Sequence, residues 1–218
     1  MSIAIITSPA NAISNLTDLV TEVRDEMDDD AYPADKIYRA IGRAEAAFNR
    51  ELRVPKMETE AILDITTEET DLPNDFLQMR RIYAEGSPDQ PVTTLSPGTL
   101  RSTYQGVSGT PAAYAIENRR IIVGPVGAFQ AKVLYYARIP ALTEDNPTNW
   151  LLDEHPDVYL HYVLSVLFNK TGDSERSALN LSIARDLIAQ INDSGMKNRW
   201  GAGPLVPTGL RQVRGARI

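Results

Sequence analysis

Helical periodicity at both ends of the chain is interrupted by a long central segment that lacks it, and this interruption limits the possible folds. Residues 14–28 and 34–53 carry apolar side chains every three or four positions, which places them on one face of a helix. Helical signals return at Pro156, first in residues 157–168, which are apolar on most sides and expected to be buried, and then in residues 174–193. Two helices are therefore expected before the interruption and two after it.

Short local signals mark the ends of these helices. Ser14 and Thr17 offer capping oxygens at the start of the first helix. Pro33 suits the first turn of the second helix, where its missing N–H has no consequence. Gly172-Asp173-Ser174 is expected to end one helix and to cap the next.

The central segment has the pattern of short strands. From about residue 57 to residue 140, glycine and proline divide the chain into runs at intervals of roughly 8–15 residues. Such spacing is typical of a small antiparallel sheet, a sandwich or a barrel. Glu117-Asn118-Arg119 has the residues of a tight hairpin turn. The predicted strands are 61–65, 76–84, 91–95, 112–117, 120–123 and 131–139.

These patterns predict an α+β fold, with a four-helix body of two plus two helices, an inserted small antiparallel β domain and an extended C-terminal tail. A chain of 218 residues can bury a real core without disulfides or metals. The predicted divisions are an N-terminal arm at 1–13, a discontinuous helical body at 14–55 and 151–195, the β domain at 56–150 and an extended basic tail at 196–218.

The composition leaves few residues for catalysis or metal binding. The chain has no cysteine, and its two histidines, His155 and His161, have no carboxylate partner in the sequence pattern. Asp28-Asp29-Asp30 lacks the alternating ligands of a calcium loop. Gly106-Val107-Ser108-Gly109 lacks the second glycine of a serine nucleophile turn. With no phosphate-binding or dinucleotide motif either, the sequence predicts no enzyme, no metal and no cofactor.

The two ends of the chain carry opposite charges. The formal net charge is −7, and residues 1–35 hold eight acidic side chains and one base, whereas residues 196–218 hold five bases and no acidic side chain. This asymmetry indicates charged partners or neighbours of different sign. The overall acidity disfavours a protein that wraps nucleic acid, because phosphate binding requires clustered cations.

The basic tail also contains apolar side chains, among them Trp200, Leu205 and Ile218. Composition leaves two interpretations open: a disordered tail, or a segment that becomes ordered on a partner, because apolar groups are costly to leave in water.

No part of the sequence predicts contact with a membrane. The chain has no apolar run of about 18 residues that could span a bilayer. Residues 1–8 contain an apolar patch without a preceding base, so we expect an extended arm rather than a secretory signal.

Several blocks of the sequence, in a fixed order, carry a resemblance to a known family. They are Leu72-Pro73-Asn74-Asp75-Phe76-Leu77-Gln78-Met79, Gly109-Thr110-Pro111-Ala112-Ala113-Tyr114, Leu134-Tyr135-Tyr136-Ala137-Arg138-Ile139-Pro140-Ala141-Leu142, and Asn149-Trp150-Leu151-Leu152 leading to Pro156-Asp157-Val158-Tyr159-Leu160. In this order and spacing they resemble the head–tail adaptor (connector) proteins of tailed bacteriophages, of the podovirus and gene-transfer-particle type. The resemblance covers most of residues 14–195.

This resemblance implies a structural virion protein that does no covalent chemistry. It implies a ring, dodecameric in such proteins, at the neck of the virion, with the portal protein on one side and a tail nozzle or stopper protein on the other. Packaged double-stranded DNA would pass through the lumen without specific binding, and acidic side chains facing the lumen would favour this passage. Assembly would take place in the host cytoplasm, without a membrane partner.

Particular residues gain expected roles in such a protein. Trp150, Pro156 and Tyr159 are expected at a structural junction between sheet and helices. Tyr135 and Tyr136 are expected on opposite faces of a strand, one inward and one outward. The C-terminal segment is expected to bind the portal through Trp200, Leu205, Val206, Leu210, Arg211, Val213, Arg214, Arg217 and Ile218.

The alternative function is a β-sandwich module that binds a glycan or a peptide. It predicts an exposed aromatic groove around Tyr104, Tyr114, Tyr135 or Trp150.

Overall fold

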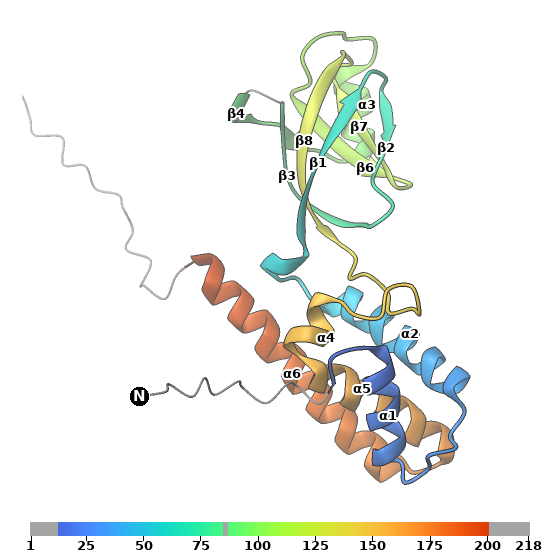
Figure 1. Ribbon diagram of the computed structural model, residues 1–218. Helices are drawn as coiled ribbons and strands as arrows, with labels where there is room; N and C mark the ends of the chain where they lie inside the picture. The colour runs from blue at the N-terminus through green and yellow to red at the C-terminus, as the bar shows by residue number, and fades with distance from the viewer. Residues whose placement is uncertain (1–12, 85–86, 201–218) are drawn as a thin grey trace, which may run out of the picture.

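The computed structural model describes residues 13–84 and 87–200. Most of its helices gather at one end of the molecule, and the strands gather at the other end together with one short helix (Figure 1). The predicted α+β class is confirmed. Residues 52–57 and 138–149 connect the two ends, which we call the helical part and the β part. Each part has a hydrophobic core of its own.

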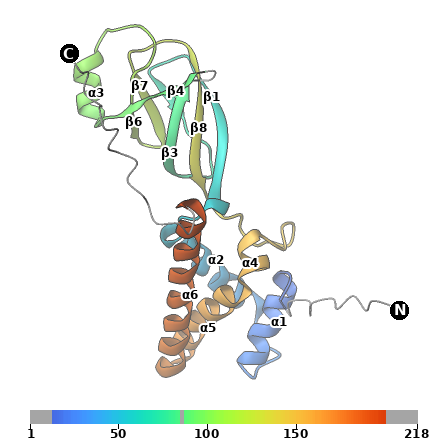
Figure 2. The ribbon, with the colours of Figure 1, turned by 90° about the vertical axis from the view of Figure 1, so that its left-hand side faces the viewer.

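One central helix, α5, organises the helical part. It packs against α1, α2 and α6, so helices from before and after the β part share a core (Figure 2). A short helix, α4, adds to the predicted two plus two helices. The bounds are α1 Leu16–Glu26, α2 Ala34–Glu51, α4 Trp150–Glu154, α5 Pro156–Thr171 and α6 Ser174–Trp200.

The predicted burial of α5 is confirmed. Tyr159, Val163 and Leu167 have no exposed surface, and they belong to the same core as Leu19 of α1 and Phe48 of α2. An α-helix that is apolar on most sides needs neighbours on most sides. None of the helices in the described part of the chain has both the length and the apolarity that a bilayer span requires.

Helix α1 begins differently from the prediction. Asn15, rather than Ser14 or Thr17, is the capping residue, and its side-chain oxygen accepts the backbone N–H of Asp18 at 3.0 Å. The Asp18 carboxylate in turn accepts hydrogen bonds from the hydroxyl and the backbone N–H of Ser14, which lower the pKa of Asp18. This reciprocal arrangement satisfies N–H groups that the start of a helix leaves free.

The predicted break between the last two helices is confirmed. Helix α5 ends at Gly172, whose φ of 88° lies in the left-handed region that favours glycine. Asp173 then accepts the backbone N–H of Arg176 at 3.0 Å and caps α6. Helix α6 continues to Trp200, beyond the predicted end of the helix at residue 193 and into the range 196–218 that was expected to be extended.

The β part contains two four-stranded sheets. The strand order is β1-β8-β3-β4 in the first sheet and β2-β7-β6-β5 in the second. The bounds are β1 Glu58–Ile65, β2 Glu69–Asp71, β3 Phe76–Ala84, β4 Ser87–Pro91, β5 Thr93–Thr94, β6 Ala113–Glu117, β7 Arg120–Gly124 and β8 Phe129–Ala137.

The two sheets enclose a common core, so the sandwich is the correct choice among the predicted β architectures. Ile82 and Val133 from the first sheet meet Ile121 and Val123 from the second in one buried cluster. The strand pairing is antiparallel, as expected, apart from the parallel pairing of β5 with β6 and an isolated parallel bridge between Ser108 and Val126. A short helix that was not predicted, α3 (Pro97–Tyr104), lies between β5 and β6 in the sequence.

The hairpin predicted at residues 117–119 is confirmed. Glu117 pairs with Arg120 across the turn, and Asn118 and Arg119 have φ values of 49° and 62°. Two consecutive positive φ values fit the type of two-residue turn whose twist matches that of the flanking strands.

Replacing Gly172 by alanine is expected to lower the free energy of unfolding by about 1 kcal/mol, because a Cβ atom is strained at this φ. The matched control is Gly42→Ala, on the exposed face of α2, where an added Cβ would meet nothing within 4 Å. This change is expected to raise the free energy of unfolding by up to about 1 kcal/mol. Urea denaturation measures the free energy of unfolding of both variants. Changes of the same sign in the two variants would contradict the conclusion that Gly172 is required for its left-handed backbone conformation.

Candidate functional site

The helical and β parts meet at a junction that contains both connecting segments and the C-terminal end of α6 (Figures 1 and 2). The residues predicted for a junction, Trp150, Pro156 and Tyr159, all lie on its helical side. Tyr159 is fully buried, whereas Trp150 and Pro156 are half-buried. The structure therefore places the three residues in one region but in different surroundings.

Asn149 holds the returning connection against α5. Its side-chain oxygen accepts hydrogen bonds from the backbone N–H groups of Leu151 and Leu152, at 3.1 and 2.9 Å, and so caps α4. Its amide nitrogen donates to the Pro140 carbonyl oxygen at 2.8 Å and to the Tyr159 hydroxyl at 2.9 Å. One buried side chain thus satisfies polar atoms from three segments.

Glu45 forms a second buried link, between α2 and the same connection. Its carboxylate accepts the backbone N–H of Leu142 at 2.7 Å. Burial raises the pKa of Glu45, although hydrogen bonds from Leu142 and Tyr159 oppose the rise. Burial likewise raises the pKa of Tyr159. Holding a carboxylate here costs free energy, which these hydrogen bonds offset in part.

Arg53 connects three elements at the junction. Its backbone N–H donates to the Asn192 side chain of α6 at 3.0 Å, and its Nε donates to Gln78 of β3 at 3.0 Å. Its guanidinium also lies over the Tyr136 ring of β8, 5.9 Å from the ring centroid. Asn192 completes the link by donating to the Glu51 carbonyl oxygen at 3.0 Å.

Helix α6 approaches the first connection closely at Gly195. A Cβ atom at this position would lie 2.8 Å from a Val54 methyl group and 3.2 Å from Pro55, so the contact requires glycine. Beside it, a hollow of about 380 Å³ is bordered by Trp150 and His155. The end of α6 is thereby held against the base of the β part.

The two adjacent tyrosines of β8 pack into different cores, Tyr135 into that of the sandwich and Tyr136 into that of the helical part. Tyr135 faces the core of the sandwich, and its hydroxyl donates a hydrogen bond to the Asp75 carboxylate at 3.0 Å. Burial, together with this hydrogen bond and the Asp75 charge, raises the pKa of Tyr135 to about 12. Tyr136 lies on the opposite face, as predicted, but the expectation that one of the two tyrosines points outward is wrong, because both are buried. Tyr136 is 4% exposed, because the helical part covers it and Arg53 and Arg80 lie over its ring.

The aromatic residues of the alternative function do not form one groove. Tyr135 and Tyr114 are buried in the sandwich core, Tyr104 packs against a separate cluster under α3, and Trp150 belongs to the helical part. Tyr114 lines one open hollow together with Phe76, several aliphatic side chains, Gln78 and Thr94, and none of the other three aromatic residues reaches it. The groove that a glycan- or peptide-binding module predicts is therefore not assembled from these four residues.

The predicted portal-binding residues lie at or beyond the end of the described chain. Trp200 is the last residue of α6, and its side chain is outside the description. Leu205, Val206, Leu210, Arg211, Val213, Arg214, Arg217 and Ile218 lie outside the described residues, as do residues 1–12 of the predicted arm.

The sequence offers two clusters of possible metal ligands, namely the pair of histidines and the acidic run at residues 28–30. Nδ1 of His161 is hydrogen-bonded to the Asn180 side chain at 2.8 Å, which explains it as a packing residue. Within residues 13–84 and 87–200, no group of three or more histidine, aspartate or glutamate side chains is arranged to hold a metal ion.

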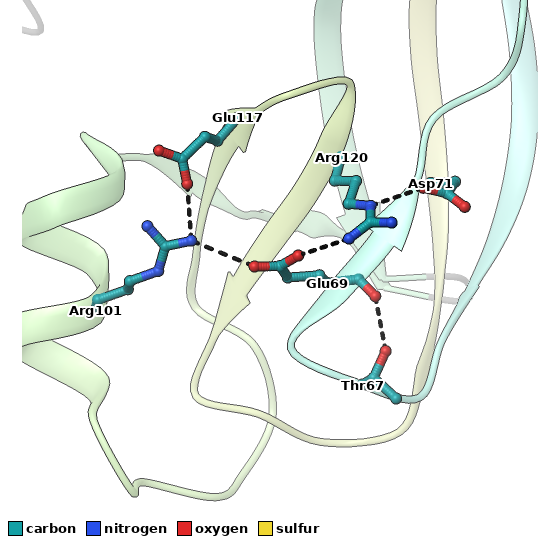
Figure 3. Close-up of polar contacts among 6 residues, drawn as sticks. All are labelled: Thr67, Glu69, Asp71, Arg101, Glu117 and Arg120. Atoms are coloured by element: carbon teal, nitrogen blue, oxygen red, sulfur yellow. Dashed lines mark hydrogen bonds and ion pairs between the residues drawn. The ribbon is translucent and has the colours of Figure 1, made fainter.

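An ion-pair network that was not predicted ties α3 to the second sheet (Figure 3). Arg101 of α3 pairs with Glu117 at 2.7 Å and with Glu69 at 3.3 Å. Arg120 pairs with the same Glu69 at 3.2 Å and with Asp71 at 3.0 Å. All five side chains are substantially exposed, so the network contributes little stability and mainly fixes the position of α3.

Some junction residues could have been found from sequence. Asn149 directly precedes an apolar run and is a preferred helix-capping residue. Glu45 is an acidic residue among the apolar positions of the α2 stripe, which signals a buried carboxylate. Arg53 gives no such signal, because its partners Gln78, Tyr136 and Asn192 come from distant segments.

The chain folds into a helical part and a β sandwich that are joined at the junction. The chain matches the family described as SU10 adaptor protein over residues 14–208, and it belongs to this family. Its role is accordingly that of a structural phage head–tail adaptor, which is located at the virion neck and contacts other phage proteins. No curated protein matches the chain.

Replacing Asn149 by alanine is expected to lower the free energy of unfolding by about 2–4 kcal/mol. The change removes the α4 cap and leaves the buried Tyr159 hydroxyl without its donor. The control is Asn169→Ala on the exposed face of α5, which should change the free energy of unfolding by less than about 0.5 kcal/mol. Chemical denaturation measures both, and similar values for the two variants would refute the role of Asn149.

Replacing Glu45 by glutamine is expected to raise the free energy of unfolding at pH 7. The raised pKa of Glu45 means that the folded state disfavours the carboxylate. At a pH above that pKa, the wild-type protein therefore has a lower free energy of unfolding than it would have with a neutral side chain at this position. As the pH falls towards the ordinary value of 4.5, the wild-type side chain becomes protonated and the difference between the proteins should shrink. Urea midpoints at pH 7 and at about pH 4 measure this, and a difference that grows at low pH would contradict it.

Proposed function

We propose that the protein forms a ring that joins the portal to the tail and lets packaged DNA pass, without covalent chemistry. The observation that carries this proposal is the family match over residues 14–208, which spans the helical part, the β part and the start of the basic tail. The helical part is the body of the subunit and the β part its inserted domain. By resemblance, the ring is dodecameric and of the podovirus or gene-transfer-particle type, with a tail nozzle or stopper protein as its other partner.

The C-terminal residues attach the ring to the portal in this proposal. Leu205, Leu210 and Ile218 supply apolar contacts, and Arg211, Arg214 and Arg217 pair with portal carboxylates. Ordering such a segment costs roughly 2–5 kcal/mol. A ring offsets this cost, because each docked neighbour raises the effective concentration of the next tail.

The junction gives the tail a defined starting point. Arg53, Asn192 and Gly195 hold the last turns of α6 against the base of the β part. Tyr159 and Asn149 hold the helices beneath them. A tail that begins from a fixed position loses less freedom on docking than one that begins from a mobile position, which supports attachment at this end.

Packaged DNA passes through the ring without specific binding in this proposal. The net charge of −7 supports it, because carboxylates facing the lumen repel phosphate groups.

The triple change Arg211→Glu, Arg214→Glu and Arg217→Glu in the full chain is expected to weaken binding to purified portal by at least about tenfold. Reversed charges would face the portal carboxylates and repel them. Native mass spectrometry of the protein alone and with portal measures binding and ring formation.

The matched control is Arg185→Glu, on the exposed surface of α6, which should bind portal like the wild type. Unchanged binding by the triple variant would overturn attachment through the tail. A wild-type protein that forms no ring with portal would overturn the adaptor ring itself.

A further inference from the structure

Helix α2 presents a line of exposed cations on the face that points away from the core. Lys36, Arg39, Arg43 and Arg50 are all exposed and follow one another at helical spacing. Lys170, at the end of α5, adds a fifth positive charge to this basic face, and burial together with the charges of Arg43, Arg39 and Lys36 lowers the pKa of Lys170.

Few carboxylates balance this basic face. Arg39 pairs with Asp35 in the preceding turn. Among the described residues, no carboxylate forms an ion pair with Arg43, Arg50 or Lys170. Tyr38, which is 42% exposed, lies two positions from Lys36 on α2 and therefore on the other edge of the exposed helix surface, outside the basic face.

A second surface of the same chain has the complementary character. A hollow of about 480 Å³ lies between the end of α1 and the start of α6, and Asp25, Glu26 and Asp28 line its acidic side. Phe168 and Leu179 line its apolar side, where Leu179 is 60% exposed. The one cation there, Arg176, already pairs with Asp173 at 3.6 Å.

The basic face and this acidic hollow lie on different sides of one subunit. Helix α5 packs between α2 and α6, so the two surfaces are separated by the core (Figures 1 and 2). Phe168 in the hollow and Lys170 on the basic face are two positions apart on α5, a rotation of about 200°. Two copies can bring the surfaces together, whereas a single subunit cannot.

We propose that the basic face of α2 in one copy docks against the acidic hollow of the next copy. Lys36, Arg39 and Arg43 then meet Asp25, Glu26 and Asp28 of the neighbouring copy. Because the two surfaces differ, the contact is head-to-tail and repeats from copy to copy until a ring closes. This inference rests on the proposed adaptor ring and identifies the surfaces that join its subunits.

Charge reversal in the full-length chain tests the contact. The first variant, Lys36→Glu with Arg43→Glu, makes the basic face acidic, and the second, Asp25→Lys with Glu26→Lys, makes the hollow basic. All four positions are exposed, so both variants should keep the wild-type circular dichroism and thermal unfolding. Each variant alone should form rings on portal at least about tenfold less well than the wild type, because like charges then face each other.

Mixing the two variants gives the decisive measurement. In the mixture each altered surface meets an opposite charge on the other variant, so ring formation should return to within about threefold of the wild type. Native mass spectrometry and sedimentation velocity at low salt should show rings containing both variants. Failure of the mixture to recover, although the wild type forms rings and each variant still binds portal, would overturn this contact but not the adaptor function.

Duplex DNA provides the competing explanation of the basic face. If the first variant forms rings like the wild type but loses duplex binding that the wild type shows, the face is a nucleic-acid surface and the contact is overturned. If the wild type forms no ring on portal, both the proposed adaptor ring and this contact are overturned.

Discussion

Closure of the helical core by two distant stretches of chain is the constraint on which the structure depends. Helices α1 and α2 come before the β part, and α5 and α6 come after it, yet α5 must be enclosed by all of them because it is apolar on most sides. The chain returns through residues 138–149, and Asn149 secures that return by capping α4 and satisfying the Tyr159 hydroxyl. Tyr159 then packs edge-on against Phe48 of α2, with ring centroids 5.0 Å apart, so polar and aromatic contacts fasten the two halves at one place.

The junction makes the two parts of the molecule behave as one body. Arg53 lies in the outgoing connection and contacts α6 through Asn192, β3 through Gln78 and β8 through Tyr136. Displacement of the β part relative to the helices would break these contacts together. Relative motion of two domains is the usual expectation unless their interface holds them, and here several elements contribute contacts to that interface.

The sequence was sufficient for features that depend on local chemistry and insufficient for those that depend on distant partners. Gly172 predicts a helix end with a left-handed residue, and Asn118 predicts a tight hairpin. The spacing of the apolar residues predicts the long helices. Helix α3 was not predicted, although Ser96 followed by Pro97 is a helix-start signal, because a serine and a proline between two strands are equally typical of a loop. The expectation that one of Tyr135 and Tyr136 points outward is wrong, because strand alternation specifies the face of a side chain but not what covers that face. The link from Asn149 to Tyr159 could be anticipated only in part, since the cap is local and the buried hydroxyl is not.

The contact at Gly195 fixes the rotation of α6 about its own axis as well as its position. Because the close approach to Val54 leaves no space for a Cβ atom, only this residue of the helix can occupy that point of contact. An α-helix turns by about 100° with each residue, so the contact also sets the rotational position at which α6 ends at Trp200. Inserting or deleting a single amino acid between these two positions would redirect everything downstream by more than a quarter turn. The number of residues between Gly195 and Trp200 is therefore constrained by this contact, whatever their side chains are.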